Sequence, residues 1–207
     1  MSMRNLIIFD FDCTISARHY WGLMMNDDKV QPDDLSVAHV LRGAMVHNFG
    51  TPNASISKSI DNDLKDLFID YVFGSEERLK WLKKFIFDLT QLKNVKIEIW
   101  TRSFGAAIHD LLSQSYTNFR DSFDEIIDRT KFRSDKKSRM CDTRRSLYKN
   151  VFIFDDSADE YAYKYTSSID HFSVFDNIHF YNQLKKEGVG IPIDNSILQS
   201  IKRIIDE

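Results

Sequence analysis

The chain has 207 residues and a formal net charge of −3, so it is long enough for one domain, or for one domain with a modest insertion. Its composition of 43% hydrophobic and 29% charged residues is typical of a globular protein and excludes a fibrous or disordered chain. Two cysteines exclude a disulfide framework, the first residues lack the apolar h-region of a secretory signal, and no apolar run reaches about 20 residues. We therefore expect a cytoplasmic protein in a reducing environment.

The first predicted element is a short buried strand at residues 6–9, which is followed at once by Asp10 and Asp12. Residues 17–74 fit a sheet poorly and suggest a small helical insertion after this strand. Within the insertion, apolar residues recur at helical spacing in two places, with a polar stretch between them. The two expected stripes are Val37, Val40, Leu41, Ala44 and Met45, and then Ile60, Leu64, Leu67, Phe68 and Tyr71.

Strands alternate with helices in the rest of the chain. Ser103 is a plausible N-cap for one of these helices. Such alternation favours βαβ units and predicts a Rossmann-like α/β fold, with a parallel sheet and helices on both faces. We expect strands at 94–101, 123–130, 149–156 and 172–175, and helices at 75–92, 104–115 and 194–206.

Polar side chains follow three of the predicted strands at the point where each strand ends. They are Asp10 and Asp12, Thr101, and the pair Asp155 and Asp156. In an open parallel sheet the carboxyl ends of the strands meet at one edge, which is where ligands bind. Clustered carboxylates repel one another unless a cation neutralises them, and oxygen ligands of this kind suit Mg²⁺. The sequence therefore predicts a magnesium site at this edge.

The same segments carry a resemblance to a known family. "DFDCT" (10–14) resembles the Asp-x-Asp-x-Thr motif of the haloacid dehalogenase (HAD) superfamily of phosphatases, and "IEIWT" (97–101) resembles its second motif. "VFIFDDSADE" (151–160) is similar to the fourth motif, in which paired acids follow an apolar strand. The resemblance implies a catalytic core made of residues 1–16 and 75–207. It implies that residues 17–74 form a small cap or flap.

The resemblance also implies a role for each acid. Asp10 would be the nucleophile that forms an aspartyl-phosphate, and Asp12 would be the general acid and then the general base. The two-residue offset on an extended strand would place Asp12 on the same side as Asp10. Mg²⁺ would be bound by Asp10, by the backbone carbonyl of Asp12 and by Asp156. The motif does not decide whether Asp155 also binds the metal or orients the other ligands.

The resemblance calls for two further groups at the phosphate. Thr101 would donate a hydrogen bond to it, and a lysine would neutralise its developing charge. Several lysines lie in the interval where the family places this residue. Lys137 is our preferred candidate and Lys136 is the next, because both lie at the expected start of the helix that precedes the fourth motif. The lysines in the interval are Lys131, Lys136, Lys137 and Lys149.

The substrate is indicated less clearly. The paired acids of the fourth motif, and the pair Thr101 and Arg102 in "WTRS", resemble the small magnesium-dependent protein phosphatases, including the phosphotyrosine-type enzymes. This favours a phosphorylated protein, with Arg102 binding the substrate, over a small phosphomonoester. His19, Tyr20 and Trp21 could line the entrance and stack on an aromatic ring. A metabolite or phosphoinositide phosphatase and a non-catalytic binding module of the same fold remain alternatives.

One segment, residues 129–149, is strongly basic. It has nine basic and two acidic residues, a net charge of +7, which leaves −10 for the rest of the chain. Such a rim would attract an anionic partner. The alternative is an ordinary solvated helix and loop. We find no aromatic-interleaved basic groove, so nucleic acid is not favoured.

Two other phosphate chemistries fit the sequence poorly. A cysteine phosphatase with Cys13 as nucleophile would need an arginine at position 19, where the chain has His19. A response-regulator receiver domain has its acid pair first in the chain and its phosphate acceptor later, which is the reverse of the order here. Phosphotransferases and phosphonatases would share the Asp10 nucleophile, and the sequence does not separate them from hydrolases.

Overall fold

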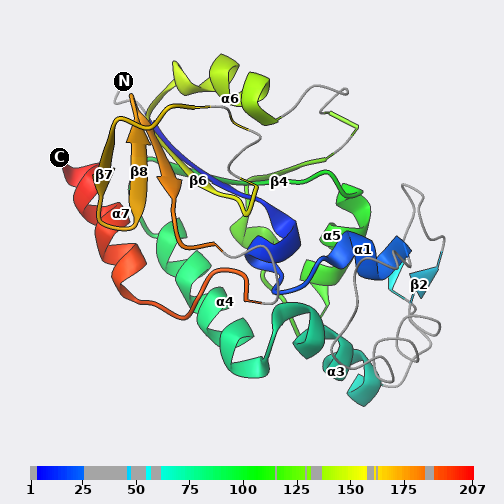
Figure 1. The fold of residues 1–207 in the computed structure, drawn as a ribbon. Coiled ribbons are helices and arrows are strands. Elements are labelled where there is room, and N and C mark those ends of the chain that lie inside the picture. The colour runs from blue at the N-terminus through cyan, green and yellow to red at the C-terminus, as the bar shows by residue number, and fades with distance from the viewer. Residues whose placement is uncertain are drawn as a thin grey trace.

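A seven-stranded mixed sheet forms the centre of the protein in a computed structural model, with the strand order β5-β4-β1-β6-β9-β8-β7 (Figure 1). Its strands are β1 (Arg4–Phe9), β4 (Val95–Trp100), β5 (Glu125–Ile127), β6 (Tyr148–Phe154), β7 (Ser167–Ile169), β8 (Phe172–Phe175) and β9 (Ile178–Tyr181). A separate antiparallel pair joins β2 (Val46–His47) to β3 (Ser55–Ile56). The structure describes residues 4–25, 46–47, 55–56, 62–114, 116–128, 130–131, 137–157, 161, 163–184 and 189–207.

Five of the strands are parallel and set the topology. Along the chain they are β1, β4, β5, β6 and β9, and in the sheet they lie in the order 3-2-1-4-5. This is the order of a Rossmann-like sheet, and its direction reverses between β1 and β6. The last two strands, β8 and β7, continue the sheet from β9 as an antiparallel meander.

Helices cover both faces of the sheet because its central strands are apolar on both sides. Ile7 and Phe9 of β1 pack toward α4 (Glu76–Thr90), α5 (Gly105–Ser113) and α7 (Ser196–Asp206), whereas Leu6 and Ile8 pack toward α6 (Lys137–Arg145). Figure 1 shows α6 on one side of the sheet, with α4 and α7 on the other. Within the described ranges, no helix combines the length and the apolar character that crossing a bilayer requires.

Most of the predicted elements are confirmed. The expected strands correspond to β1, β4, β6, β8 and a shortened β5, and the expected helices correspond to α4, α5 and α7. The predicted α/β class, the parallel strands and the helices on both faces are also present. The sequence analysis missed β7 and β9. It was wrong about the cap of α5, because the N-cap is Phe104 and the Gly105 amide donates to Asp128 Oδ2 at 3.0 Å.

The predicted insertion is described only in part. Its described helices are α1 (Tyr20–Met25) and α3 (Asn62–Phe73), and the first predicted stripe, Val37 to Met45, lies outside the described residues. The second stripe is partly wrong, because Leu67 is exposed and Ile69 is buried instead. The buried residues of α3 pack in the same core as β1 and α4. The division into a core and an insertion at residues 17–74 stays a prediction.

A chain of buried polar side chains crosses three strands on the α7 face of the sheet. His179 Nε2 donates to Asn150 Oδ1 at 3.1 Å, and Asn150 Nδ2 donates to Asn5 Oδ1 at 3.0 Å. The imidazole stacks on Phe152, with ring centroids 4.9 Å apart. Burial lowers the pKa of His179 to about 4, so the folded protein holds this imidazole neutral.

This burial predicts a loss of stability in mild acid. The unfolded chain takes up a proton on His179 below its ordinary pKa of 6.5, while the folded chain resists protonation down to about pH 4. We expect His179 to cost about 2 kcal/mol of stability between pH 7 and pH 5. Urea unfolding at pH 7 and at pH 5 measures this loss as a decrease in the free energy of unfolding. Because carboxyl groups titrate in the same range, the readout is the difference between the wild type and His179→Gln, and an identical pH dependence would contradict the prediction.

Candidate active site

The predicted acids lie at the point where the strand order reverses. Asp10 follows β1 and Asp155 follows β6, and the preceding residues Phe9 and Phe154 are paired in register. The Asp10 amide continues this ladder by donating to the Phe154 carbonyl at 2.7 Å. Ligands bind at such reversal points, outside the carboxyl ends of the strands. Local strand pairing thus brings together two carboxylates that lie far apart in the sequence.

A tight turn, η1 (Phe11–Ile15), follows Asp10 and carries Asp12. The prediction that Asp12 lies on the same extended strand as Asp10 is therefore wrong, since β1 ends at Phe9. Cys13 has a φ of 58°, in the left-handed region, which costs about 1 kcal/mol or more for a residue other than glycine. Its amide lies 3.3 Å from both Ser16 Oγ and the Arg18 carbonyl, and these contacts help to hold the turn.

Arg78 of α4 ties this turn to the rest of the fold. Its buried guanidinium donates four hydrogen bonds of 2.7 to 3.1 Å to the backbone carbonyls of Thr14, Ile15, Phe73 and Ile191. Gly190, with a φ of +59°, passes so close that an added Cβ would lie 2.1 Å from Arg78 Nη2. Burial lowers the pKa of Arg78 to about 10, and the guanidinium stays charged at neutral pH.

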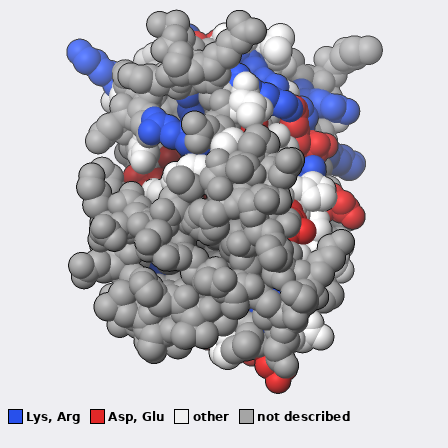
Figure 2. Space-filling model, turned by 90° about the vertical axis from the view of Figure 1, so that its right-hand side faces the viewer, with Lys and Arg blue, Asp and Glu red and all other residues white. Residues whose placement is uncertain are grey.

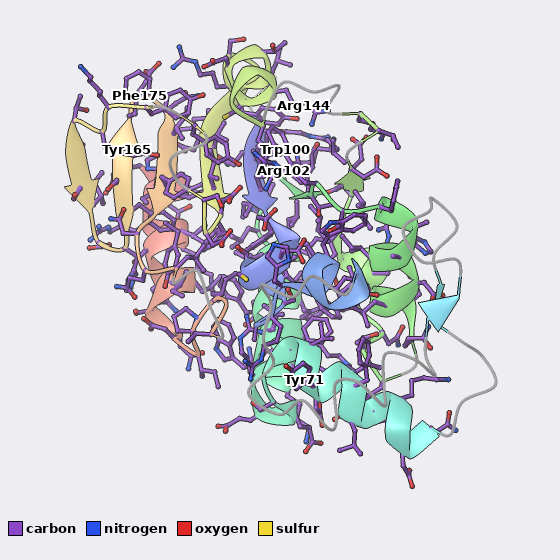
Figure 3. The ribbon with its side chains drawn as sticks, turned by 45° about the vertical axis from the view of Figure 1, so that its right-hand side comes forward. Tyr71, Trp100, Arg102, Arg144, Tyr165 and Phe175 are labelled. Carbon is purple, nitrogen blue, oxygen red and sulfur yellow. The ribbon has the colours of Figure 1, made fainter. Side chains whose placement is uncertain are left out.

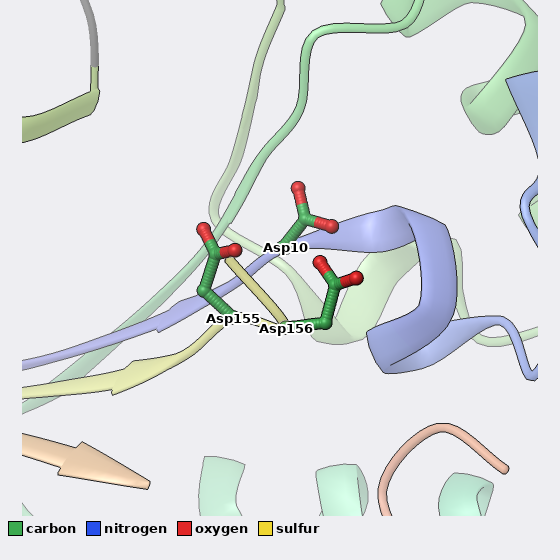
Figure 4. Close-up of side chains that lie close together, drawn as sticks. All are labelled: Asp10, Asp155 and Asp156. Atoms are coloured by element: carbon green, nitrogen blue, oxygen red, sulfur yellow. The ribbon is translucent and has the colours of Figure 1, made fainter. Parts of the chain in front are cut away.

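Three carboxylates form the centre of the site. Asp10, Asp155 and Asp156 each offer an oxygen, and these oxygens lie within 4.8 Å of one another (Figure 4). Asp10 and Asp155 are buried and Asp156 is half-buried. Hard oxygen donors gathered at this spacing fit Mg²⁺, which takes carboxylates together with water and phosphate oxygens.

Lys137, the first residue of α6, provides the positive charge in the centre. Its buried ammonium donates to Asp10 Oδ1 and, at 2.8 Å, to Asp155 Oδ2. Two more donors hold Asp155: the Tyr161 hydroxyl bonds to Oδ2 and the Ser157 amide bonds to Oδ1, both at 2.9 Å. Asp155 is therefore strongly engaged by protein donors, whereas Asp156 is bonded by the Ser157 hydroxyl at 3.3 Å.

The electrostatics also favour a cation here. Three carboxylates and one ammonium leave two excess negative charges when all are ionised. Burial raises the pKa of Asp10 well above its usual range, with Asp155 adding to this and Lys137 opposing it. Burial, together with Asp155, raises the pKa of Asp156 to about 6. Burial disfavours the charge on Lys137, but the Asp10 and Asp155 carboxylates outweigh it and raise its pKa.

The Asp12 side chain lies outside this group of three. Its Oδ1 accepts from the Trp21 amide and its Oδ2 accepts from the Ser103 hydroxyl, both at 2.8 Å. His19 Nδ1 lies 3.9 Å from Oδ1 and accepts from the Gly22 amide at 2.9 Å. The prediction that the Asp12 backbone carbonyl binds the metal stays a prediction.

Thr101 and Arg102 follow β4, as predicted, but differ in burial. Thr101 is fully buried, and its Oγ1 accepts from the Ser103 amide at 3.0 Å, which leaves the hydroxyl proton able to donate elsewhere. Arg102 is exposed. The second lysine candidate, Lys136, lies outside the described residues.

The described part of the basic segment is largely paired within the protein. Arg144 bonds to both oxygens of the buried Glu98 at 2.5 and 2.7 Å and lies over the Trp100 ring at 5.8 Å (Figure 3). Lys131 bonds to Glu125 at 2.6 Å. Figure 2 shows acidic side chains beside the Lys and Arg side chains on the upper part of one face. A role for residues 129–149 in binding an anionic partner stays a prediction.

Two site residues were missed or misplaced by sequence reasoning. Tyr161 follows the paired acids, but no sequence pattern shows that its hydroxyl turns back to Asp155. Ser103 was interpreted as a helix cap, although it contacts Asp12. A signal for Ser103 was available in its place two residues after Thr101, at the same sheet edge as the acids.

Comparison with known proteins gives similarity in structure only. No protein-family model and no curated protein matches the sequence. Two crystal structures of the Legionella pneumophila effector Ceg4 are similar in structure. One is 15% identical, with a TM-score of 0.51, and the alignment covers 99% of this chain and 96% of that one. The other is 17% identical, with a TM-score of 0.50, and the alignment covers 99% of this chain and 95% of that one. The HAD domain of the Legionella pneumophila effector Lem4 aligns at 17% identity and a TM-score of 0.49, covering 99% of this chain and 95% of that one. At this identity the likeness to Ceg4 concerns the fold alone.

Proposed function

We propose that the chain is a Mg²⁺-dependent phosphomonoester hydrolase of the HAD type. The observation that carries this proposal is the buried Lys137 ammonium between Asp10 and Asp155, with Asp156 beside them at the reversal point of a Rossmann-like sheet. A fold needs neither three converging acids nor a buried lysine at this edge, and their burial has a cost in free energy. A site for a phosphate and a divalent cation accounts for both.

The proposed reaction has two displacements at phosphorus. A carboxylate oxygen of Asp10 attacks, the bond to the leaving oxygen breaks, and that oxygen takes the proton from the Asp12 carboxylic acid. A water then attacks the phosphorus of the aspartyl-phosphate and gives its proton to the Asp12 carboxylate, while the bond from phosphorus to Asp10 breaks. The products are an alcohol or phenol and inorganic phosphate, and both aspartates return to their starting states.

The other groups bind and orient the phosphate. Lys137 would neutralise charge on the phosphoryl oxygens, and Thr101 would donate its hydroxyl proton to one of them. Asp10, Asp156 and the Asp12 carbonyl would hold Mg²⁺, with Asp155 orienting Lys137. The metal would supply charge neutralisation of the phosphoryl group and of the clustered carboxylates. The hydrogen bonds of Asp155 to Tyr161, Lys137 and Ser157 support an orienting role for it.

For the substrate, we propose a phosphorylated protein, with phosphotyrosine preferred. Beside the motif resemblance, the support is an aromatic pair at Asp12. Trp21, whose amide bonds to Asp12, contacts Phe104 edge to face with ring centroids 5.4 Å apart. An aromatic leaving group could pack against such rings. Arg102, exposed at the end of β4, would bind the protein around the phosphate.

The first prediction concerns the nucleophile. Purified protein with Mg²⁺ should hydrolyse p-nitrophenyl phosphate, and EDTA should abolish the activity. Asp10→Asn should lower kcat by about a thousandfold or more, because the amide cannot form the phosphoryl intermediate. The matched control is Asp206→Asn, an exposed acid at the end of α7, which should retain activity. Activity that survives both EDTA and Asp10→Asn would contradict the proposed function.

The second prediction separates the two lysine candidates. Lys137→Met should lower kcat by about a hundredfold or more, because it removes the cation at the phosphate while keeping most of the apolar stem. It should also raise the pKa of Asp10 further, since this buried carboxyl group loses its cationic partner. Lys136→Met is measured in parallel. The assignment to Lys137 is wrong if Lys136→Met has the larger effect on kcat.

The third prediction concerns substrate class. Between peptides of one sequence that carry phosphotyrosine or phosphoserine, kcat/KM should favour phosphotyrosine by about tenfold or more. Trp21→Leu should reduce that preference, whereas Trp81→Leu, which alters a tryptophan stacked on Phe85 in α4, should leave it intact. Phosphoinositides, nucleotides and sugar phosphates complete the panel. A better substrate among these would replace the protein substrate in the proposal and leave the phosphatase chemistry in place.

A further inference from the structure

We propose that Ser103 is a positioning residue for proton transfer: its hydroxyl stays hydrogen-bonded to the Asp12 carboxyl group in both protonation states of that group. This inference rests on the proposed function, in which Asp12 first gives a proton and then takes one. Ser103 is buried, and its hydroxyl lies 2.8 Å from Asp12 Oδ2. Its own amide is fixed by a 3.0 Å bond to Thr101 Oγ1, so the residue is anchored to the end of β4.

The Ser103 hydroxyl is available for this role because another residue serves the helix that follows. A serine just before a helix commonly accepts from an amide of the first turn. Here the Gly105 amide, the first of α5, donates instead to Asp128 Oδ2 at 3.0 Å, from the end of β5. Ser103 Oγ is therefore directed to Asp12 rather than to its own helix.

The two partners of Asp12 differ in what they can do. The Trp21 amide donates only, so Asp12 Oδ1 acts as an acceptor throughout. A hydroxyl both donates and accepts, so Ser103 can donate to the Asp12 carboxylate and, after rotation of its O–H bond, can accept from the carboxylic acid. The hydrogen bond between Ser103 and Asp12 Oδ2 can thus persist in both protonation states of the carboxyl group.

An aromatic contact fixes the two partners of Asp12 relative to each other. Phe104, the residue after Ser103, packs edge to face on Trp21, whose amide is the other donor to Asp12. The start of α1 and the loop after β4 therefore hold Asp12 from both sides. Removing the Ser103 hydroxyl would free Oδ2, and the carboxyl group could rotate away from the leaving oxygen.

The leaving group provides the test, because only a poor leaving group needs a proton. For Ser103→Ala, kcat/KM should fall about tenfold or more with phenyl phosphate and by less than about threefold with p-nitrophenyl phosphate, since nitrophenolate departs unprotonated. Ser103→Thr should restore the wild-type ratio between the two substrates. The matched control is Ser200→Ala, a buried serine of α7 whose hydroxyl donates to the Ser196 carbonyl, and it should leave the ratio unchanged.

A double-mutant cycle with Asp12→Asn completes the experiment. In that background Ser103→Ala should not change the substrate ratio further, because the proton that it positions is gone. Thermal melts check folding, and Ser103→Cys, with a weaker donor of similar shape, takes the place of Ser103→Ala if alanine is not tolerated. Equal losses on both substrates would overturn the inference while the phosphatase function stands. A wild type that hydrolyses neither substrate would overturn the proposed function itself.

Discussion

The buried ammonium of Lys137 is the interaction on which the site depends. It joins the start of α6 to the ends of β1 and β6, and it is the described cation within bonding distance of Asp10 and Asp155. Without it, two carboxylates would be buried side by side, an arrangement whose cost in free energy would push at least one of them to the neutral form. With it, the centre still carries excess negative charge, and this residual charge is what makes a divalent cation a fitting ligand. The ion pairs of Lys137 thus connect the carboxyl ends of β1 and β6 to the start of α6.

The placement of Lys137 depends in turn on how α6 is held. At the far end of the helix, Arg144 bonds to the fully buried Glu98 of β4, which also accepts from Trp100 Nε1 at 2.6 Å and pairs with Lys96 at 2.5 Å. Cys141, one turn after Lys137, packs into the sheet face between these ends. Part of the charge that the sequence suggested for a basic rim is therefore used inside the protein, to orient the helix.

Much of the site could be predicted because it follows from strand ends. Apolar runs that stop at acids indicated the ends of β1 and β6, and parallel pairing brings such ends together without further information. The strands at the β7 edge of the sheet were harder to predict. In the meander, β7, β8 and β9 are three or four residues long and are joined by two-residue turns that begin with Asp170 (φ 49°) and Asp176 (φ 57°). Strands this short give little periodicity, although an Asp in such a turn between apolar runs is a recognisable hairpin signal.

Other features could not be predicted because they depend on contacts across the fold. Whether a serine before a helix caps it is normally a local question. At Ser103 it is decided by Asp128, which lies 23 residues from Gly105 in the chain and reaches its amide from another strand. The hydrogen bond from the Tyr161 hydroxyl to Asp155 is likewise a contact that no local sequence pattern predicts. The composition of these segments carries no trace of either contact.

The guanidinium of Arg78 has a consequence for how this protein can vary. Its four acceptors are main-chain carbonyls, from the turn after β1, the end of α3 and residue 191. Every amino acid supplies such a carbonyl, so these hydrogen bonds place no demand on the type of side chain at the four acceptor positions, which is restricted instead by burial in the core. Arg78 itself cannot be replaced by lysine in the same way. A lysine would offer a single ammonium, whereas the planar guanidinium donates to three segments at once. The four contacts therefore restrict the residue type at position 78 and not at the positions whose carbonyls accept from it.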